Sequence, residues 1–152
     1  LLIQVAGRAG RDSKPGKVLV QTHYPEHPLL QDLVHNGYLH FAQQALVERQ
    51  QALLPPFSYQ ALFRAEANYP SYPEKFLRAL AQLPLEQCEL AGPVPAAMEK
   101  KAGKFRYHLI VQAKSRKHLH LAIQQLLSHI PTIDGHQKLR WSIDVDPLDL
   151  NW

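Results

Sequence analysis

The chain alternates between two spacings of apolar residues, one typical of strands and the other of helices. Three segments alternate apolar and polar side chains, a two-residue period that predicts strands with one buried face. A fourth, shorter strand is expected just before residues 92–95, whose glycine and prolines predict a turn. In chain order the predicted strands are residues 59–67, 87–91, 105–113 and 139–145.

Two helices are predicted between these strands, because their apolar residues recur three and four positions apart. Pro73 stands near the first turn of one helix, and Ser115 is a suitable N-cap for the other. The apolar stripes consist of Phe76, Leu77, Leu80 and Leu83 in the first helix, and of Leu119, Ala122, Ile123, Leu126, Leu127 and Ile130 in the second. The resulting order, βαββαβ, predicts a ferredoxin-like α+β domain: an antiparallel sheet with both helices on one face.

Pro55 and Pro56 end a long helical pattern and therefore mark a domain boundary. We expect one domain over residues 55–152 and a separate part over residues 1–54. The elements predicted for that part are a strand at residues 18–22 and helices at residues 29–35 and 38–53. Its apolar surface is too small for independent folding, so we interpret it as the end of a preceding domain.

Composition narrows the class of protein only slightly. The 152 residues contain 17 Lys and Arg against 13 Asp and Glu, and a net charge of +4 permits a polyanionic partner without requiring one. No apolar run approaches the roughly 20 residues that cross a bilayer, so we expect no membrane association. The single cysteine, Cys88, has no partner for an internal disulfide, which fits a cytoplasmic protein.

The opening of the chain carries a motif with recognisable chemistry. Gln4, Gly7, Arg8 and Arg11 form the pattern Q-x-x-G-R-x-G-R, which resembles motif VI of superfamily-two helicases. Two arginines three positions apart share one face of a helical turn, and their forked donors suit the charge of a transferring phosphoryl group. An arginine supplied in this way acts as an arginine finger. The alternative is a basic loop without catalytic meaning, because Gly-Arg pairs are frequent in such loops.

The rest of the chain favours the helicase interpretation. Five further segments resemble, in the same order, the C-terminal part of the primosomal protein N′ (PriA) family of replication-restart helicases. These segments are residues 16–22, 54–57, 92–96, 109–116 and 144–147. Together with the opening motif, the resemblance covers nearly the whole chain.

The resemblance implies a part of an ATP-dependent 3′-to-5′ DNA helicase, which recognises abandoned replication forks and helps to assemble the primosome. Residues 1–54 would end the second RecA-like lobe, with Arg8 and Arg11 catalytic and Gln4 and Gly7 binding ATP. The family uses ATP and Mg²⁺, and it holds zinc through paired cysteines. The sequence has no G-x-x-x-x-G-K-[ST] loop, no DExH sequence and no paired cysteines. We therefore expect this chain alone to bind without catalysis.

The resemblance also implies the partners: forked and single-stranded DNA, the acidic tail of single-stranded DNA-binding protein and other primosome proteins, in a bacterial, nucleoid-associated setting. The first candidate surface is a hairpin tip with three lysines, continued by arginines on two strands. Lysines at such a tip attract phosphates without reading bases. The predicted DNA-binding residues are Lys100, Lys101, Lys104, Arg106 and Arg140, with Lys138 beside them. The alternative is a solvated loop that only favours solubility.

The second candidate surface is the start of the last helix. Arg116 and His120 lie one turn apart, opposite the apolar stripe, and Arg116 adds its cation to the positive end of the helix dipole. We expect these residues to receive the terminal carboxylate of the partner tail. The alternative is an ordinary polar helix face.

Three other interpretations compete with these. An RNA-recognition-like module would place aromatic residues on the open sheet face, but the phase of Phe63, Phe105, Tyr107 and Trp141 puts them on the helix side. A structural brace that docks on the helicase lobes and binds nothing else remains open. Metal binding at residues 23–27 is disfavoured, because only two histidines and one glutamate are present and no further ligand is near.

Overall fold

A computed structural model describes residue 4 and residues 17–150 of the chain. The chain divides into two compact units, Leu1–Gln51 and Ala52–Trp152, and each is described here by itself. The boundary that we predicted falls after Leu54, close to this division. Among the described residues, every helix is too short or too polar to cross a bilayer.

The first unit contains helix α2, Pro28–Gln51, which is interrupted at Gly37. Gly37 has φ 80° and ψ 179°, a conformation that favours glycine because it has no Cβ. The two helices predicted for this region are therefore confirmed. The strand predicted at residues 18–22 is wrong, because those residues adopt no regular structure. A strand needs a neighbour to pair its backbone groups, and the described residues of this unit offer none.

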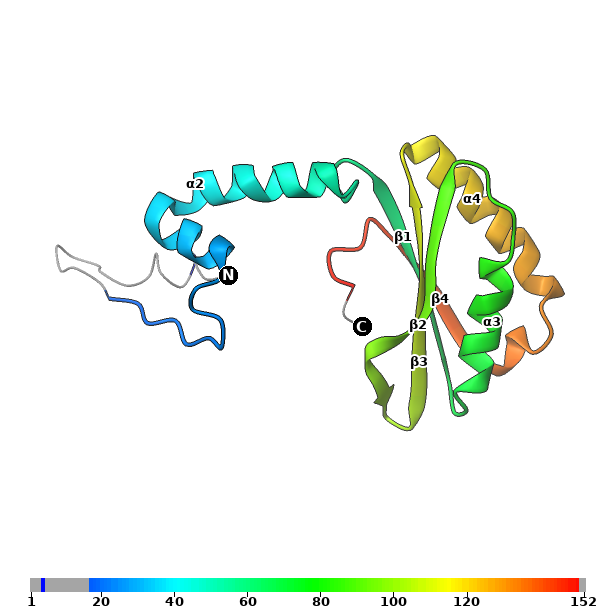
Figure 1. The fold of residues 1–152 in the computed structure, drawn as a ribbon. Helices are drawn as coiled ribbons and strands as arrows, with labels where there is room; N and C mark the ends of the chain where they lie inside the picture. Colours follow the sequence, from blue (N-terminus) through cyan, green and yellow to red (C-terminus); the bar gives the residue numbers. More distant parts are fainter. Residues whose placement is uncertain (1–3, 5–16, 151–152) are drawn as a thin grey trace. The chain divides into compact units, whose positions relative to one another are not determined.

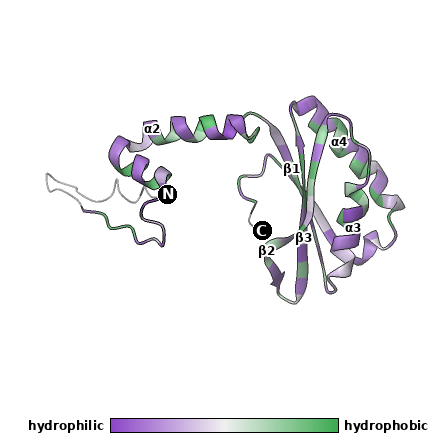
Figure 2. Cartoon of the chain, in the orientation of Figure 1, coloured by the Kyte–Doolittle hydropathy of each residue, from purple (hydrophilic) through white to green (hydrophobic). Residues whose placement is uncertain are grey.

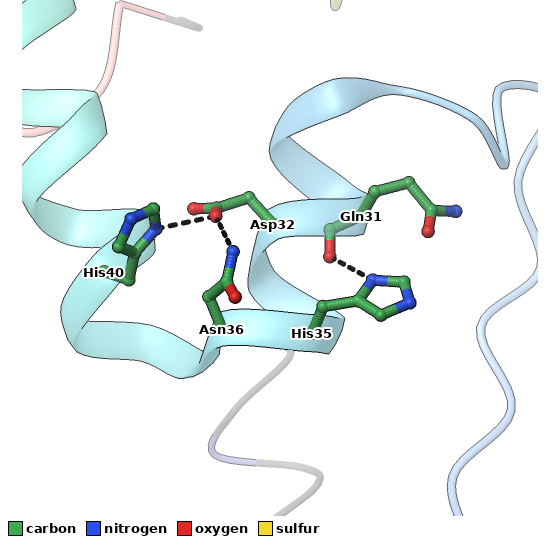
Figure 3. A network of polar contacts seen from close by, with 5 residues as sticks. All are labelled: Gln31, Asp32, His35, Asn36 and His40. Atoms are coloured by element: carbon green, nitrogen blue, oxygen red, sulfur yellow. Dashed lines mark hydrogen bonds and ion pairs between the residues drawn. The ribbon is translucent and has the colours of Figure 1, made fainter.

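Side chains bridge the break in α2 (Figure 3). Asp32 Oδ1 lies 2.7 Å from Asn36 Nδ2 and 2.6 Å from His40 Nδ1, so that one carboxylate joins the turns before and after Gly37. The hydrogen bond from Asn36 is the main cause of the lowered pKa of Asp32. No residue of α2 is buried, and Figure 2 shows hydrophilic residues interspersed with hydrophobic ones along it. Among the described residues, polar side chains and not a buried core bridge the break at Gly37.

The second unit is built on a four-stranded antiparallel sheet with the strand order β2-β3-β1-β4. The strands are β1 (Tyr59–Ala67), β2 (Cys88–Lys101), β3 (Lys104–Ala113) and β4 (Arg140–Val145). The helices are α3 (Ser71–Ala81) and α4 (Arg116–His129), followed by the short helices η1 (Ile130–Thr132) and η2 (His136–Lys138). Figure 1 shows α3 and α4 on the same face of the sheet, which confirms the predicted ferredoxin-like α+β arrangement.

The core lies between this face and the two helices. Its largest fully buried side chains come from β1, β3 and both helices, as the stripes predicted: Phe63, Phe76, Leu77, Leu80, Leu109, Val111 and Leu126. Phe76 stacks on Trp141 with ring centroids 6.4 Å apart. Phe63 and Tyr107 are in the buried cluster, and Phe105 and Trp141 pack against it. The aromatic residues therefore lie on the helix side, which argues against the RNA-recognition-like module.

Helix α4 begins as the sequence predicts. Ser115 is extended, and its Oγ accepts a hydrogen bond from the backbone N–H of His118 at 3.3 Å. The cap satisfies one of the N–H groups that the first turn of a helix leaves without a partner.

Strand β2 differs from the prediction. It continues for 14 residues through the segment that we assigned to a turn, and its register with β3 shifts after Ala91 and again after Pro95. Prolines are tolerated because β2 is an edge strand with irregular pairing. Gly92 is required at the first shift, since its φ is 118° and an added Cβ would lie 2.9 Å from the carbonyl oxygen of His108.

The sheet face opposite the helices is less open than alternation alone suggests. Leu62, Gln60 and Arg106 point to this face, yet they are 0%, 8% and 5% exposed. The backbone N–H of Asp146 donates to the Gln60 carbonyl at 2.9 Å, and Figure 1 shows the residues after β4 on this side of the sheet. Val145 is 53% exposed because it ends an edge strand.

Truncation of Leu80 to alanine tests the core. Leu80 is fully buried in the helix-covered cluster, so Leu80→Ala is expected to lower the free energy of unfolding by about 2–5 kcal/mol. Leu148→Ala is the matched control, because Leu148 is fully exposed. Urea denaturation of both variants, followed by circular dichroism, measures the difference; equal stabilities would contradict the described packing.

Candidate functional site

The motif at the start of the chain lies mostly outside the described residues. Gly7, Arg8 and Arg11 belong to the part that is not described, and Gln4 is exposed. The roles assigned to these four residues in binding and hydrolysing ATP therefore stay predictions. In residue 4 and residues 17–150, no group of three or more His, Cys, Asp or Glu side chains is placed to hold a metal ion.

The three lysines of the first candidate surface lie at the tip of the β2–β3 hairpin. Lys101 pairs with Lys104, so that only Ala102 and Gly103 form the loop. Both loop residues have positive φ, 50° and 80°, which is the geometry of a type I′ turn. This turn matches the twist of the strands and keeps the lysines together at one end of the sheet.

Each lysine of the tip has a different environment. Lys100 Nζ lies 4.9 Å from the centroid of the Phe105 ring. Lys104 Nζ lies 3.4 Å from Glu66 Oε1. Lys101 is exposed. A cation–π contact at an exposed position contributes little stability, about 1 kcal/mol or less, so Lys100 can exchange this contact for a phosphate. Lys104 belongs to a part-buried ion pair, in which Glu66 competes with a phosphate.

The two arginines predicted on this surface differ in accessibility. Glu66 lies between them in the sheet, opposite Arg106 on β3 and Arg140 on β4. Arg140 is exposed, whereas Arg106 is 5% exposed. We expected the Arg106 side chain to be accessible to DNA. This prediction is wrong, because the sheet face opposite the helices is partly covered. We leave Arg106 out of the candidate DNA-binding surface.

The second candidate surface is a groove of about 450 Å³ between the start of α4 and the end of β4. Its apolar lining comes from Leu119, Ile123 and Val145, and Arg116 and His120 contribute polar groups. The structure thus brings the two predicted residues together in one groove. The full lining consists of Arg116, Lys117, Leu119, His120, Ile123, Val145 and Asp146.

Arg116 is held by residues that sequence reasoning missed. One guanidinium nitrogen lies 3.3 Å from Asp146 Oδ2, and the guanidinium carbon lies 5.0 Å from the centroid of the Tyr59 ring. The side chain is nevertheless 73% exposed. No sequence pattern links Tyr59 and Asp146 to Arg116, because Tyr59 begins β1, Asp146 follows β4 and Arg116 begins α4, so the three meet only in the folded domain.

A polar cluster on the sheet face opposite the helices was also missed. Arg64 donates to Asp144 Oδ2 at 2.9 Å. His108 lies opposite Arg64 in the β1–β3 pairing, and its Nδ1 is buried without a hydrogen-bond partner in the described structure. Burial lowers the pKa of His108, and the charge of Arg64 lowers it further. His108 therefore favours the neutral state in the folded protein.

A second hollow, of about 360 Å³, lies at the end of β3 that is farther from the β2–β3 hairpin. Gln112 donates from Nε2 to the Leu53 carbonyl at 2.9 Å and accepts from Gln60 Nε2 at 2.6 Å. Cys88 lines the same hollow, and burial raises the pKa of its thiol. A thiol with a raised pKa is a poor nucleophile, so this arrangement offers no evident catalysis.

The lowered pKa of His108 predicts a loss of stability in acid. Below its ordinary pKa of 6.5 the unfolded chain binds the proton more readily than the folded chain, so the free energy of unfolding falls as the pH falls. His108→Gln is expected to lose less stability between pH 7.5 and pH 5.5 than the unchanged protein. Ser142→Ala is the control, because Ser142 on β4 lies opposite Arg64 in the β1–β4 pairing. Urea denaturation at each pH provides the measurement, and identical losses in all three proteins would contradict the assignment.

Comparison with known proteins supplies the family. The family model described as "Primosomal protein N C-terminal domain" matches residues 50–148. Three relatives are each named "Replication restart protein PriA". The protein of Haemophilus influenzae is 41% identical and matches 99% of this chain. Those of Synechocystis sp. and Bacillus subtilis are 32% and 27% identical over 99% and 97% of it.

This chain spans about a fifth of the length of those relatives: 21%, 18% and 19% respectively. Among solved structures, the de novo designed protein Foldit4 matches 60% of this chain and 99% of its own length, with a TM-score of 0.43 and 8% identity. The family model covers most of the chain, including the whole described sheet and both of its helices. The chain therefore belongs to the primosomal protein N C-terminal domain family.

Proposed function

We propose that this chain is the C-terminal part of an ATP-dependent 3′-to-5′ DNA helicase that restarts stalled replication forks, and that its described domain serves in binding. The relatives named for replication restart support the process. The observation that carries the binding role is the tight hairpin tip with its lysines at one end of the sheet.

The catalytic part of this proposal concerns the full-length protein. Arg8 and Arg11 would act on a nucleotide whose phosphates are held by another part of the helicase, with Gln4 and Gly7 close to it. ATP and Mg²⁺ are the proposed cofactors of that larger protein, together with the zinc of the family.

The hairpin tip suits phosphates of DNA. Its lysines carry flexible ammonium groups, which neutralise phosphates without sequence preference. Exposed Arg140 and Lys138 add positive charge at the same end of the sheet. Such contacts position a protein according to the shape and charge of the fork and not according to the base sequence of the DNA.

Charge reversal tests the hairpin. Lys100→Glu together with Lys101→Glu is expected to weaken binding to forked DNA and to reduce the slope of log K against log salt by about 2, because two phosphate contacts are lost. The matched control is Lys114→Glu with Lys117→Glu, which makes the same change of charge beyond the opposite end of β3. Fluorescence anisotropy at several salt concentrations measures both, and equal losses in the two variants would leave only a general effect of net charge.

The groove beside α4 is the proposed site for the acidic tail of single-stranded DNA-binding protein. Leu119, Ile123 and Val145 offer apolar surface to a side chain of the tail, while Arg116 offers its guanidinium to the terminal carboxylate. The stack on Tyr59 orients that guanidinium. Asp146 shares Arg116 in the free protein, so tail binding would replace one carboxylate by another.

Arg116→Glu is expected to abolish binding of the tail peptide, because it replaces attraction for a carboxylate by repulsion. His120→Ala, which removes a neighbour in the same groove, should weaken binding less. Lys75→Glu on α3 makes the same change of charge at an exposed site that does not line the groove and serves as the control. Isothermal titration calorimetry with the full-length helicase provides the measurement, and unaltered binding by Arg116→Glu would remove this assignment.

A further inference from the structure

Two exposed tyrosines stand where β1 leads into α3: Tyr69 lies in the connection and Tyr72 in the first turn of α3. Tyr69 is 66% exposed and Tyr72 is 36% exposed. Their ring centroids lie 6.1 Å apart with an angle of 69° between the ring planes. The backbone N–H of Tyr72 donates to the carbonyl of Tyr69 at 3.3 Å, and Pro70 restricts the chain between them. The pair is thus held in place by the backbone although its rings face solvent.

The tyrosines lie at the end of the sheet that carries the lysine hairpin. Ala67, the last residue of β1, pairs with Phe105, which in turn pairs with Lys100. Tyr69 follows Ala67 by two residues. Lys138, which precedes β4, places its Nζ 5.9 Å from the centroid of the Tyr72 ring. Exposed aromatic rings and exposed cations therefore occur together at this end.

Two carboxylates in this region are paired with cations, and the exposed Glu99 is outnumbered by the exposed Lys100, Lys101 and Lys138. Glu66 is paired with Lys104 at 3.4 Å, and Glu74, in the first turn of α3, is paired with Arg78 at 2.7 Å. Positive charge therefore predominates beside the rings. An anionic ligand with flat apolar parts fits such a surface better than a purely apolar or a purely anionic one.

Core packing does not explain why aromatic residues occupy positions 69 and 72. Neither tyrosine belongs to the buried cluster or to the residues that pack against it. Proteins that bind single-stranded nucleic acid combine exposed aromatic rings, on which bases stack, with a basic surface that follows the backbone. The aromatic residues of the strands lie on the helix side, whereas Tyr69 and Tyr72 stand beyond the end of β1 with their rings exposed.

We propose that Tyr69 and Tyr72 form a stacking platform for unpaired bases of single-stranded DNA, while Lys138 and the hairpin lysines contact the adjacent phosphates. This inference rests on the proposed function and names the part of a fork that this end of the sheet would engage, a single-stranded segment next to a duplex. Stacking does not depend on base identity, so the platform has no sequence preference.

Replacement of both rings by leucine tests the platform. Tyr69→Leu with Tyr72→Leu keeps apolar side chains but removes the aromatic faces, and it is expected to weaken binding of the 152-residue chain to a single-stranded thymidine oligonucleotide about tenfold. Binding to a blunt duplex should change less than twofold. Tyr24→Leu with Tyr38→Leu, at two exposed tyrosines of the other unit, is the matched control and should change neither. Tyr69→Trp with Tyr72→Trp should retain single-strand binding, and circular dichroism checks that each variant is folded.

The outcomes separate this inference from the proposed function. If Lys100→Glu with Lys101→Glu weakens binding to both nucleic acids and the leucine variant weakens single-strand binding alone, both stand. If the leucine variant binds the single strand as the unchanged chain does, the platform is wrong whatever the lysines do. If neither variant alters binding, the DNA-binding role of this end of the sheet fails as well.

Discussion

The pairing of β1 with two neighbours at once is the constraint on which the second unit depends. β1 lies between β3 and β4, and its residues contribute to both faces of the sheet. Because side chains alternate along a strand, this register places Phe63 under the helices and Arg64 on the other face. A shift by one residue would exchange the two sets, so the core and the polar cluster are determined together.

The same strand separates the two candidate surfaces. The hairpin and the tyrosine pair lie near Ala67. Tyr59, at the other end of β1, contacts Arg116, which lines the groove. Nine residues of antiparallel strand extend about 30 Å, so nucleic acid at one end would leave the groove at the other end accessible. Simultaneous contact with DNA and a protein tail would therefore need no rearrangement of the sheet.

Charge is distributed differently over the sheet face and its ends. On the face opposite the helices, cations meet carboxylates: Arg64 binds Asp144, and Glu66 lies opposite Arg106 and Arg140. Partial burial of this face favours such pairing, because an unpaired charge loses its hydration there. At the ends of the strands the side chains reach solvent and can keep a net positive charge. This is why the proposed interactions concentrate at the ends.

The sequence by itself determined the strands β1, β3 and β4 and the helices α3 and α4, because strand and helix periods depend on neighbours in the chain. The stripe that includes Leu80, the cap at Ser115 and the hairpin at Ala102–Gly103 are local in this sense. The family resemblance was also evident from the sequence alone, because it rests on short segments that occur in the same order along the chain. The strand expected at residues 18–22 and the turn expected at residues 92–95 failed because strand pairing depends on which neighbour is present.

Tertiary structure decided which polar residues are accessible and which distant residues meet. Alternation along β3 assigned Arg106 to an exposed face, but the cover of that face comes from other parts of the fold. Arg116 gained Tyr59 and Asp146 as neighbours only because β1 and β4 pair and α4 packs beside them. The physical reason is that burial and long-range contact depend on how elements pack, while local patterns record only the preferences of each segment.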